Sequence, residues 1–168
     1  MAIKFKKLRA VKTPNRAHVH DAGIDLFIPE YSSELAKSIV ELTEKNNGSV
    51  SKIDKDGFVL QPGERVVIPS GIQVDIEDKQ TYLKGENKSG IATRLGLVLG
   101  ACVVDADYHG EIYISLINTS NEPVTFKYGQ KIVQLIEQRY YTSPWTEVED
   151  IDTNSDRGTN GFGSTGLV

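Results

Sequence analysis

Two aspartates and a tyrosine stand together in the middle of the chain, in the stretch Val103-Val104-Asp105-Ala106-Asp107-Tyr108-His109-Gly110. Residues 111–118 follow with side chains that alternate between two faces, which predicts a β-strand. A strand, a charged turn and a second strand would hold a carboxylate rigidly near the rim of a sheet. Asp is also a common turn former because it hydrogen-bonds its own backbone. By itself this stretch favours a plain hairpin in which the aspartates only form the turn. Other stretches of the chain must decide whether the carboxylates have a functional role.

A second group of residues has the chemistry of phosphate recognition. Lys88, Ser89 and Gly90 follow one another and would offer a point charge, a hydroxyl and exposed backbone N–H groups. Asp25 and Gln134 each lie among apolar neighbours, where a polar side chain needs hydrogen-bond partners. Asp25 is therefore either a structural anchor or a ligand residue. For Gln134 the protein interior is the default partner and a ligand is the alternative.

The chain ends in a glycine-rich stretch, residues 156–166, that contains hydroxyl groups. It lacks the Gly-Lys-Ser/Thr ending of a P-loop, and such a composition ordinarily indicates a disordered terminus. Phe162 between two glycines is unusual for a linker, since it could stack on a flat ring. Arg157, Ser164 and Thr165 could reach phosphate oxygens. The stretch is thus expected to behave as a lid over a bound ligand.

Composition limits the class of protein. The chain has 168 residues, 25% charged and 39% hydrophobic, which fits one soluble globular domain. A net charge of -4 and a pI near 5.4 argue against nonspecific nucleic-acid binding. The single cysteine, Cys102, cannot form an internal disulfide and suggests a reducing compartment. No signal peptide or membrane span is apparent, so a cytoplasmic location is expected.

The pattern of short segments predicts an all-β fold with one helix. Turn signals recur at short intervals, and the Val- and Ile-rich segments between them indicate a sandwich, barrel or jelly roll. The helix is expected over residues 32–46, where Ser32 can cap its start and Leu35, Ile39 and Leu42 share one face. It is interpreted as a surface helix that caps one end of the sheet. The expected strands span residues 3–11, 58–60, 64–68, 72–76, 111–118, 123–126 and 130–136, with a turn at 69–71.

Five stretches in this order resemble the motifs of the trimeric deoxyuridine triphosphatases (dUTP diphosphatases). The resemblance covers nearly the whole chain outside residues 29–57. Any one motif is modest evidence, whereas five in the correct order are specific. The five stretches are Ala22–Leu26, Lys88–Ala92, Val104–Gly110, Gly129–Leu135 and Arg157–Gly166.

The resemblance implies a jelly-roll domain over residues 1–150, with a helix-bearing insertion at 29–57 and a flexible arm at 151–168. It implies a homotrimer whose active sites lie at subunit contacts, so that the arm of one chain closes over a site formed by others. The implied reaction is hydrolysis of dUTP to dUMP and pyrophosphate. Such a reaction limits uracil incorporation into DNA and supplies dUMP for thymidylate synthesis. Mg2+ is expected on the triphosphate and its waters, near Asp25, without direct protein ligands.

Carried over residue by residue, the resemblance makes Asp105 the carboxylate that activates the attacking water at the α-phosphorus. Tyr108 would pack on the deoxyribose and leave no room for a 2′-hydroxyl. Backbone groups of Ala101, Cys102 and Val103 would pair with the uracil edge. A tight hairpin at this point would exclude the methyl group of thymine, which is otherwise worth only ~1–3 kcal/mol.

The remaining implied roles concern the phosphates and the arm. Mg2+, Lys88 and Arg157 would supply charge, which phosphoryl transfer needs more than a strong nucleophile. Asp25 would support the site, and Phe162 would cover the uracil ring. The other expected substrate-binding residues are Ser89, Gly90, Gln134, Gly163, Ser164 and Thr165.

Three departures from the family pattern and two alternatives remain. Lys88 stands where the family usually has Arg, Cys102 where Gly is common, and the insertion is longer than the usual loop. The insertion is expected to pack on the trimer rim or to bind a regulatory protein at residues 32–48. A deoxycytidine triphosphate deaminase shares the jelly roll, but the Asp105–Tyr108 stretch and Phe162 speak against it. A non-enzymatic binding module is the second alternative, and the complete set of catalytic residue types speaks against it as the sole role.

Overall fold

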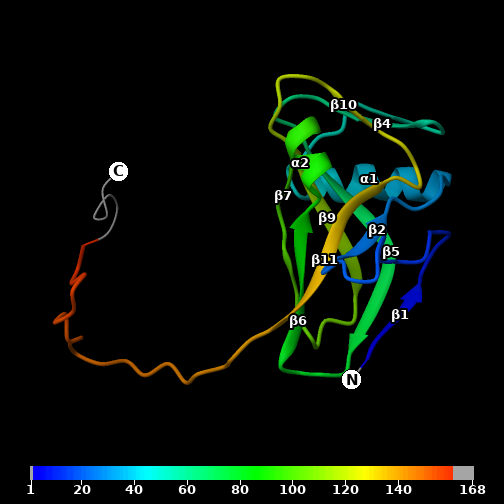
Figure 1. Cartoon of the computed structure of the whole chain (residues 1–168). Coiled ribbons are helices and arrows are strands. Elements are labelled where there is room, and N and C mark those ends of the chain that lie inside the picture. The colour runs from blue at the N-terminus through cyan, green and yellow to red at the C-terminus, as the bar shows by residue number, and fades with distance from the viewer. Residues whose placement is uncertain (1, 161–168) are drawn as a thin grey trace.

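The computed structural model describes residues 2–160, and within them the hydrogen-bonded strands fall into three antiparallel sheets (Figure 1). Two four-stranded sheets have the orders β1-β5-β9-β7 and β2-β11-β6-β8, and a small third sheet has the order β10-β4-β3. The strands are β1 Ile3–Lys7, β2 Ile24–Phe27, β3 Lys52–Asp54, β4 Gly57–Leu60, β5 Arg65–Ile76, β6 Thr81–Asn87, β7 Leu97–Leu99, β8 Val103–Val104, β9 Glu111–Asn118, β10 Val124–Phe126 and β11 Lys131–Arg139.

The core lies between the inner faces of the sheets, as the alternation in the sequence predicts. Ile112, Ile114 and Leu116 of β9 are buried, whereas Tyr113 between them is exposed. Such period-two burial is typical of a strand with one face in the core. Together with the dominance of strands, it confirms the prediction of an all-β, jelly-roll fold.

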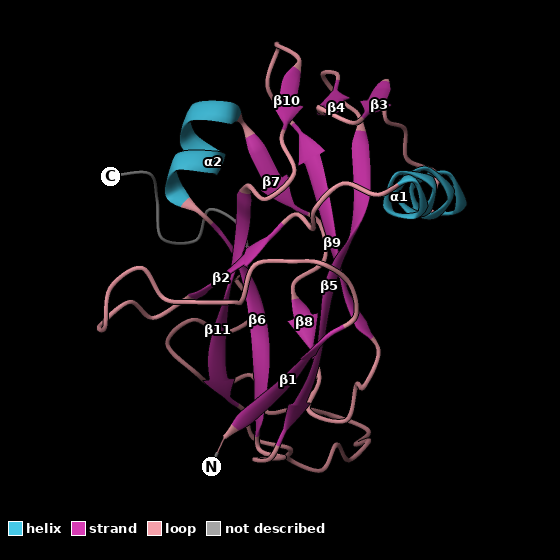
Figure 2. Cartoon of the chain, turned by 90° about the vertical axis from the view of Figure 1, so that its right-hand side faces the viewer, coloured by secondary structure: helices cyan, strands magenta, loops and turns pink. Residues whose placement is uncertain are grey.

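The predicted helix is present as α1, Ser33–Lys45. Ser32 is its N-cap, and the Ser32 hydroxyl accepts a hydrogen bond from the N–H of Leu35 at 3.0 Å. The helix lies beside β5 (Figure 2) and buries Leu35, Ile39 and Thr43 there. Residues 72–76 of β5 pair with β1, so α1 covers the remaining edge of the strand, near Val67. α1 is thus a surface helix, but it lies along the edge of β5 and does not cap the end of the sheet.

Two expectations about strand bounds are wrong. β1 ends at Lys7 instead of reaching Val11. Residues 65–76 form one strand instead of two, because the chain passes Pro69 as an irregularity in the pairing with β9 and not as a turn. A proline and a positive-φ glycine are tolerated at such a bulge; Gly71 there has φ 72°.

A second helix, α2 at Ser89–Leu95, is present, whereas the sequence pattern predicted only the helix at residues 32–46. It has only seven residues, too few for a convincing helical period. The helix ends at Gly96, which takes the left-handed conformation with φ 64° that is typical of a glycine at a helix C-terminus. Neither α1 nor α2 is long and apolar enough to span a membrane.

Candidate active site

The catalytic candidate Asp105 lies directly after β8, in a turn where the carbonyl of Asp105 accepts a hydrogen bond from the N–H of Tyr108 at 3.1 Å. The expected hairpin around it is wrong. β8 pairs with β6 and β9 pairs with β5 and β7, so the turn crosses from one sheet to the other. The carboxylate is exposed at this rim, accessible to water and substrate.

Tyr108 is anchored at the same turn. Its hydroxyl donates to the carbonyl of Glu111 at 2.7 Å, and burial raises the pKa of the phenol. The ring packs so closely over Gly110 that a Cβ atom there would come within 2.4 Å of the Tyr108 hydroxyl. Glycine is therefore required at position 110 for this ring position. The side chain remains 40% exposed, which leaves a face for a ligand.

Side chains outside the motif hold this turn, and sequence reasoning missed them. Lys79 donates to the carbonyl of Ala106 at 2.8 Å, and Gln73 donates to the carbonyl of His109. Both come from β5 or the turn after it, far away in sequence. No local pattern predicts such a contact, because it depends on how β5 and β9 pair.

The segment expected to bind uracil has an unexpected geometry. β7 belongs to one sheet and β8 to the other, so Gly100–Val103 is a crossing between sheets and not a tight hairpin. Its backbone is fixed on both sides. The N–H of Gly100 donates to the carbonyl of Ser115 at 2.9 Å, and the carbonyl of Cys102 accepts from Gly85 at 2.6 Å. Ala101 and Val103 are exposed beside it.

The phosphate candidates gather in a surface groove between α2 and β11. Lys88, Ser89 and Gly90 at the start of α2 line it together with Gln134 of β11. The Gln134 amide donates to the carbonyl of Asn87 at 3.1 Å, which leaves its oxygen toward Gly23, where an added Cβ would lie within 2.3 Å of that oxygen. The structure therefore brings these four predicted residues together. The groove also has Arg94 and Lys131 in its lining, which sequence reasoning did not assign.

Asp25 lies behind this groove as the partner of two lysines. It is 3% exposed, and its carboxylate pairs with Lys88 and, at 2.8 Å, with Lys131. Burial raises the pKa of this carboxyl, but the hydrogen bonds and charges of Lys131 and Lys88 outweigh burial and lower it. Asp25 is thus an ionised anchor that holds two cations next to the groove.

The described part of the arm leaves the jelly roll. Tyr140 still donates its N–H to the carbonyl of Gln80 at 3.0 Å, and beyond it the chain leads away from the sheets (Figure 1). Arg157 donates to the carbonyl of Asn160 at 3.0 Å, within the arm itself. The structure therefore does not bring Arg157 to the groove of its own chain. The predicted residues Phe162, Gly163, Ser164 and Thr165 lie outside the described residues.

The two halves of the predicted site are far apart in one chain. Val104 pairs with Leu83, so Asp105 continues beside Tyr82 near the start of β6. Lys88 follows the other end of the same strand, and a rise of about 3.3 Å per residue puts it about 20 Å away along the strand. A single chain therefore cannot present Asp105 and Lys88 to adjacent phosphates.

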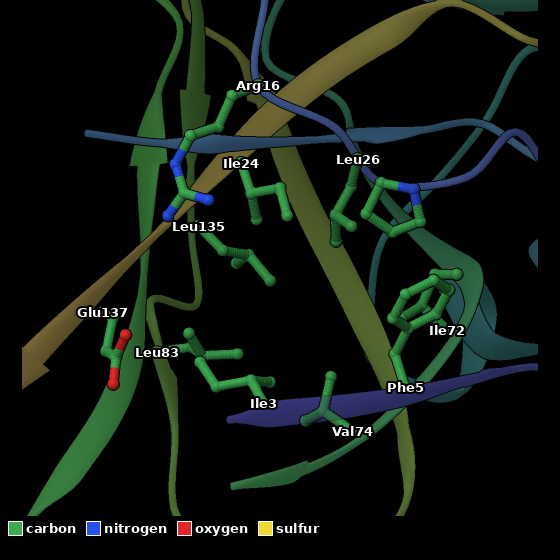
Figure 3. Close-up of a pocket in the computed structure, with 11 residues that line it drawn as sticks. Ile3, Phe5, Arg16, Ile24, Leu26, Ile72, Val74, Leu83, Leu135 and Glu137 are labelled. Carbon is green, nitrogen blue, oxygen red and sulfur yellow. The ribbon is translucent and has the colours of Figure 1, made fainter. Parts of the chain in front are cut away.

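An apolar cavity of about 230 Å³ lies elsewhere, between β1 and β2 (Figure 3). Figure 3 shows Ile3, Val74 and Leu83 around it, with Arg16 and Glu137 at one side. It contains none of the predicted site residues that the structure describes. Within residues 2–160 there is also no cluster of three His, Cys, Asp or Glu side chains that could hold a metal ion.

Comparison with known proteins identifies the family of this jelly roll. The dUTPase family model matches residues 54–166. The deoxyuridine 5′-triphosphate nucleotidohydrolase of Shewanella piezotolerans is 37% identical over 160 residues, which cover 93% of this chain and 99% of the relative. That of Finegoldia magna is 39% identical over 114 residues, or 67% of this chain and 78% of the relative.

Solved structures share the fold. A mutant dUTPase of Staphylococcus bacteriophage 80alpha with dUpNHpp has a TM-score of 0.74 at 22% identity, with 99% of each chain covered. The dUTPase of phage phi11 of S. aureus, described with a species-specific insert, has a TM-score of 0.67 at 20% identity, covering 91% of this chain and 99% of that one. Fold and site thus define a jelly-roll nucleotide hydrolase. The chain belongs to the dUTPase family, which confirms the resemblance read from its five motifs.

Proposed function

We propose that this enzyme hydrolyses dUTP to dUMP and pyrophosphate through a water molecule activated by Asp105. Family membership supports the overall reaction. The observation that carries the mechanism is the groove in which Lys88, Ser89 and Gln134 meet, backed by the cation pair on Asp25. Such a groove suits an anionic chain of phosphates, since phosphoryl transfer depends mostly on positioning and charge.

The role of Asp105 follows from its place in the turn. It is an exposed carboxylate on a backbone fixed by Lys79 and Gln73, so it can hold a water molecule at a constant position. A positioned general base contributes on the order of 10²–10⁴-fold to the rate. Tyr108, anchored next to it, would pack on the sugar of the same nucleotide.

A homotrimer completes the proposal, because Asp105 and Lys88 are about 20 Å apart along β6 of one chain. In a symmetric assembly the turn of one subunit can face the groove of the next. The extended path of residues 140–160 is consistent with an arm that closes over a neighbouring site (Figure 1). The predicted regulatory partner at residues 32–48 remains a separate prediction.

Mg2+ belongs to the substrate in this proposal. Asp25 is occupied by two lysines, and residues 2–160 hold no three-ligand cluster, so this part of the chain offers no all-protein magnesium cage. Mg2+ commonly keeps its waters and binds through substrate phosphates. A related phage dUTPase structure is described with a structural Mg(II) ion. Bound to the triphosphate, the ion would neutralise charge that develops on the phosphate oxygens.

The test is pyrophosphate release from dUTP, dTTP, dCTP and UTP, with and without Mg2+. We expect Mg2+-dependent turnover of dUTP well above the other three, and no ammonia from dCTP. Asp105→Asn is expected to bind a non-hydrolysable dUTP analogue like the parent while losing about 10²–10⁴-fold in kcat. Asp107→Asn, in the same turn, is the matched control. An Asp105→Asn variant with the parent rate would refute the base assignment.

A further inference from the structure

The phosphate groove contains more positive charge than the predicted residues account for. Lys88, Lys131 and Arg94 all line it. Two of these, Lys88 and Lys131, are paired with the carboxylate of Asp25. Arg94 is different: among residues 2–160 no carboxylate lies within ion-pair distance of it, and its guanidinium makes no hydrogen bond there. Within the described part of the chain, the groove thus contains one cation without a partner.

Arg94 is placed by α2 on the wall of the groove. It follows Gly90 by four residues, which puts both on one face of the helix, with Ser89 on the preceding turn. Ser89, Gly90 and Arg94 all belong to the lining of the groove, opposite Gln134 of β11. A ligand that reaches the Ser89 hydroxyl and the Gln134 amide therefore lies within the field of the Arg94 guanidinium.

The chemistry of arginine supplies what Lys88 lacks. Lys88 offers only an ammonium, which is held by the carboxylate of Asp25. A guanidinium presents a planar fork that can bind two phosphate oxygens at once, which an ammonium cannot do. The geometry points to Arg94 as a phosphate-binding residue that supplies this fork from the last turn of α2. This inference rests on the proposed function and adds a binding residue to it.

The charge balance indicates which ligand depends on it. Lys88, Lys131 and Arg94 against Asp25 leave two net positive charges, and loss of Arg94 leaves one. A nucleoside monophosphate needs less neutralisation than a triphosphate. Arg94 therefore discriminates by the number of phosphates, binding the pyrophosphate portion of dUTP and contributing little to dUMP.

Arg94 could instead act only on its own helix, since it lies in the last turn of α2, where a cation interacts favourably with the helix C-terminus. Such a role needs a positive charge but neither the fork nor a nucleotide. Loss of Arg94 would then change the stability of the protein, and it would not change the affinity for a triphosphate more than the affinity for a monophosphate. The two roles are therefore separable by measurement.

The experiment compares full-length Arg94→Gln and Arg94→Lys with the parent by calorimetric titration of a non-hydrolysable dUTP analogue, dUDP and dUMP, each with Mg2+. Arg94→Gln is expected to weaken the triphosphate analogue by about tenfold or more, dUDP by less, and dUMP by less than about twofold. Arg94→Lys is expected to fall between, because charge is kept and the fork is lost. Arg139→Gln is the matched control, since Arg139 pairs with Asp78 at 3.3 Å outside the groove.

Two results would overturn the inference. One is a parent-like affinity of Arg94→Gln for the triphosphate analogue, and the other is an equal loss for dUMP and the triphosphate analogue. Steady-state kinetics give a second readout, in which KM for dUTP rises in Arg94→Gln more than kcat falls. If the parent protein itself releases no pyrophosphate from dUTP, the proposed function fails, and that outcome is distinct from a failure of Arg94.

Discussion

Helix α1 provides a hydrogen-bond partner for the edge of β5 that, among residues 2–160, has no neighbouring strand near Val67. Removing the hydroxyl group of Thr43 tests this role. The Thr43 side chain is fully buried, and its oxygen accepts a hydrogen bond from the N–H of Val67 at 3.0 Å. That N–H points away from β9, to the edge where β1 no longer pairs. Thr43→Val keeps the shape and nearly the same helix propensity but removes the acceptor. The Val67 N–H is then buried without a partner.

The expected cost follows from this geometry. An unsatisfied buried N–H costs about 1–3 kcal/mol, and the added methyl group returns under about 1 kcal/mol by burial. A net loss of up to about 2 kcal/mol in the free energy of unfolding is expected. For a chain of this length that corresponds to a decrease of up to roughly 8 °C in Tm.

Hydrogen exchange provides the most direct assay. The Val67 amide is expected to exchange faster in Thr43→Val, while amides in the centre of β9 keep their protection. Thr93→Val is the matched control, because Thr93 is an exposed threonine on the other helix. Equal Val67 protection in Thr43→Val and the parent would refute the idea that α1 satisfies this strand edge.

Two further predictions concern the site. Refolding a mixture of Asp105→Asn and Ser89→Ala chains should restore activity at up to about a quarter of the sites. The reason is that a symmetric shared site takes the two residues from different subunits. A mixture as inactive as its components would place both residues in the site of one chain. Asp25→Asn should destabilise the protein at neutral pH, because Lys88 and Lys131 lose their shared carboxylate. The lowered pKa of Asp25 means that its stabilising contribution is present above the ordinary carboxyl pKa and is lost as pH falls through the lower folded value. The difference in Tm between parent and variant should therefore shrink only in acid, and a difference that is constant down to about pH 2 would contradict the pairing.

Local patterns predicted the elements well where a long or capped segment carried them. The Ser32 cap and the spacing of Leu35 and Ile39 predicted α1 to within a residue at each end. Local patterns failed where a segment was short, or where its conformation depended on pairing with a strand distant in sequence. α2 is too short to show a period, and pairing with β9 made one continuous strand of β5 in spite of Pro69.

Residue types in order determined the family, the all-β class and most of the groove, because Lys88, Ser89 and Gln134 carry their chemistry in the side chain itself. Tertiary structure alone decided that Lys131 joins Lys88 on Asp25 and that Lys79 and Gln73 hold the turn after Asp105. It also decided that no carboxylate among residues 2–160 pairs with Arg94. The physical reason is that a charge or a carbonyl acquires its partner from strand pairing and sheet packing. Strand pairing and sheet packing bring together residues that are far apart in the chain, so no local sequence pattern predicts their contact.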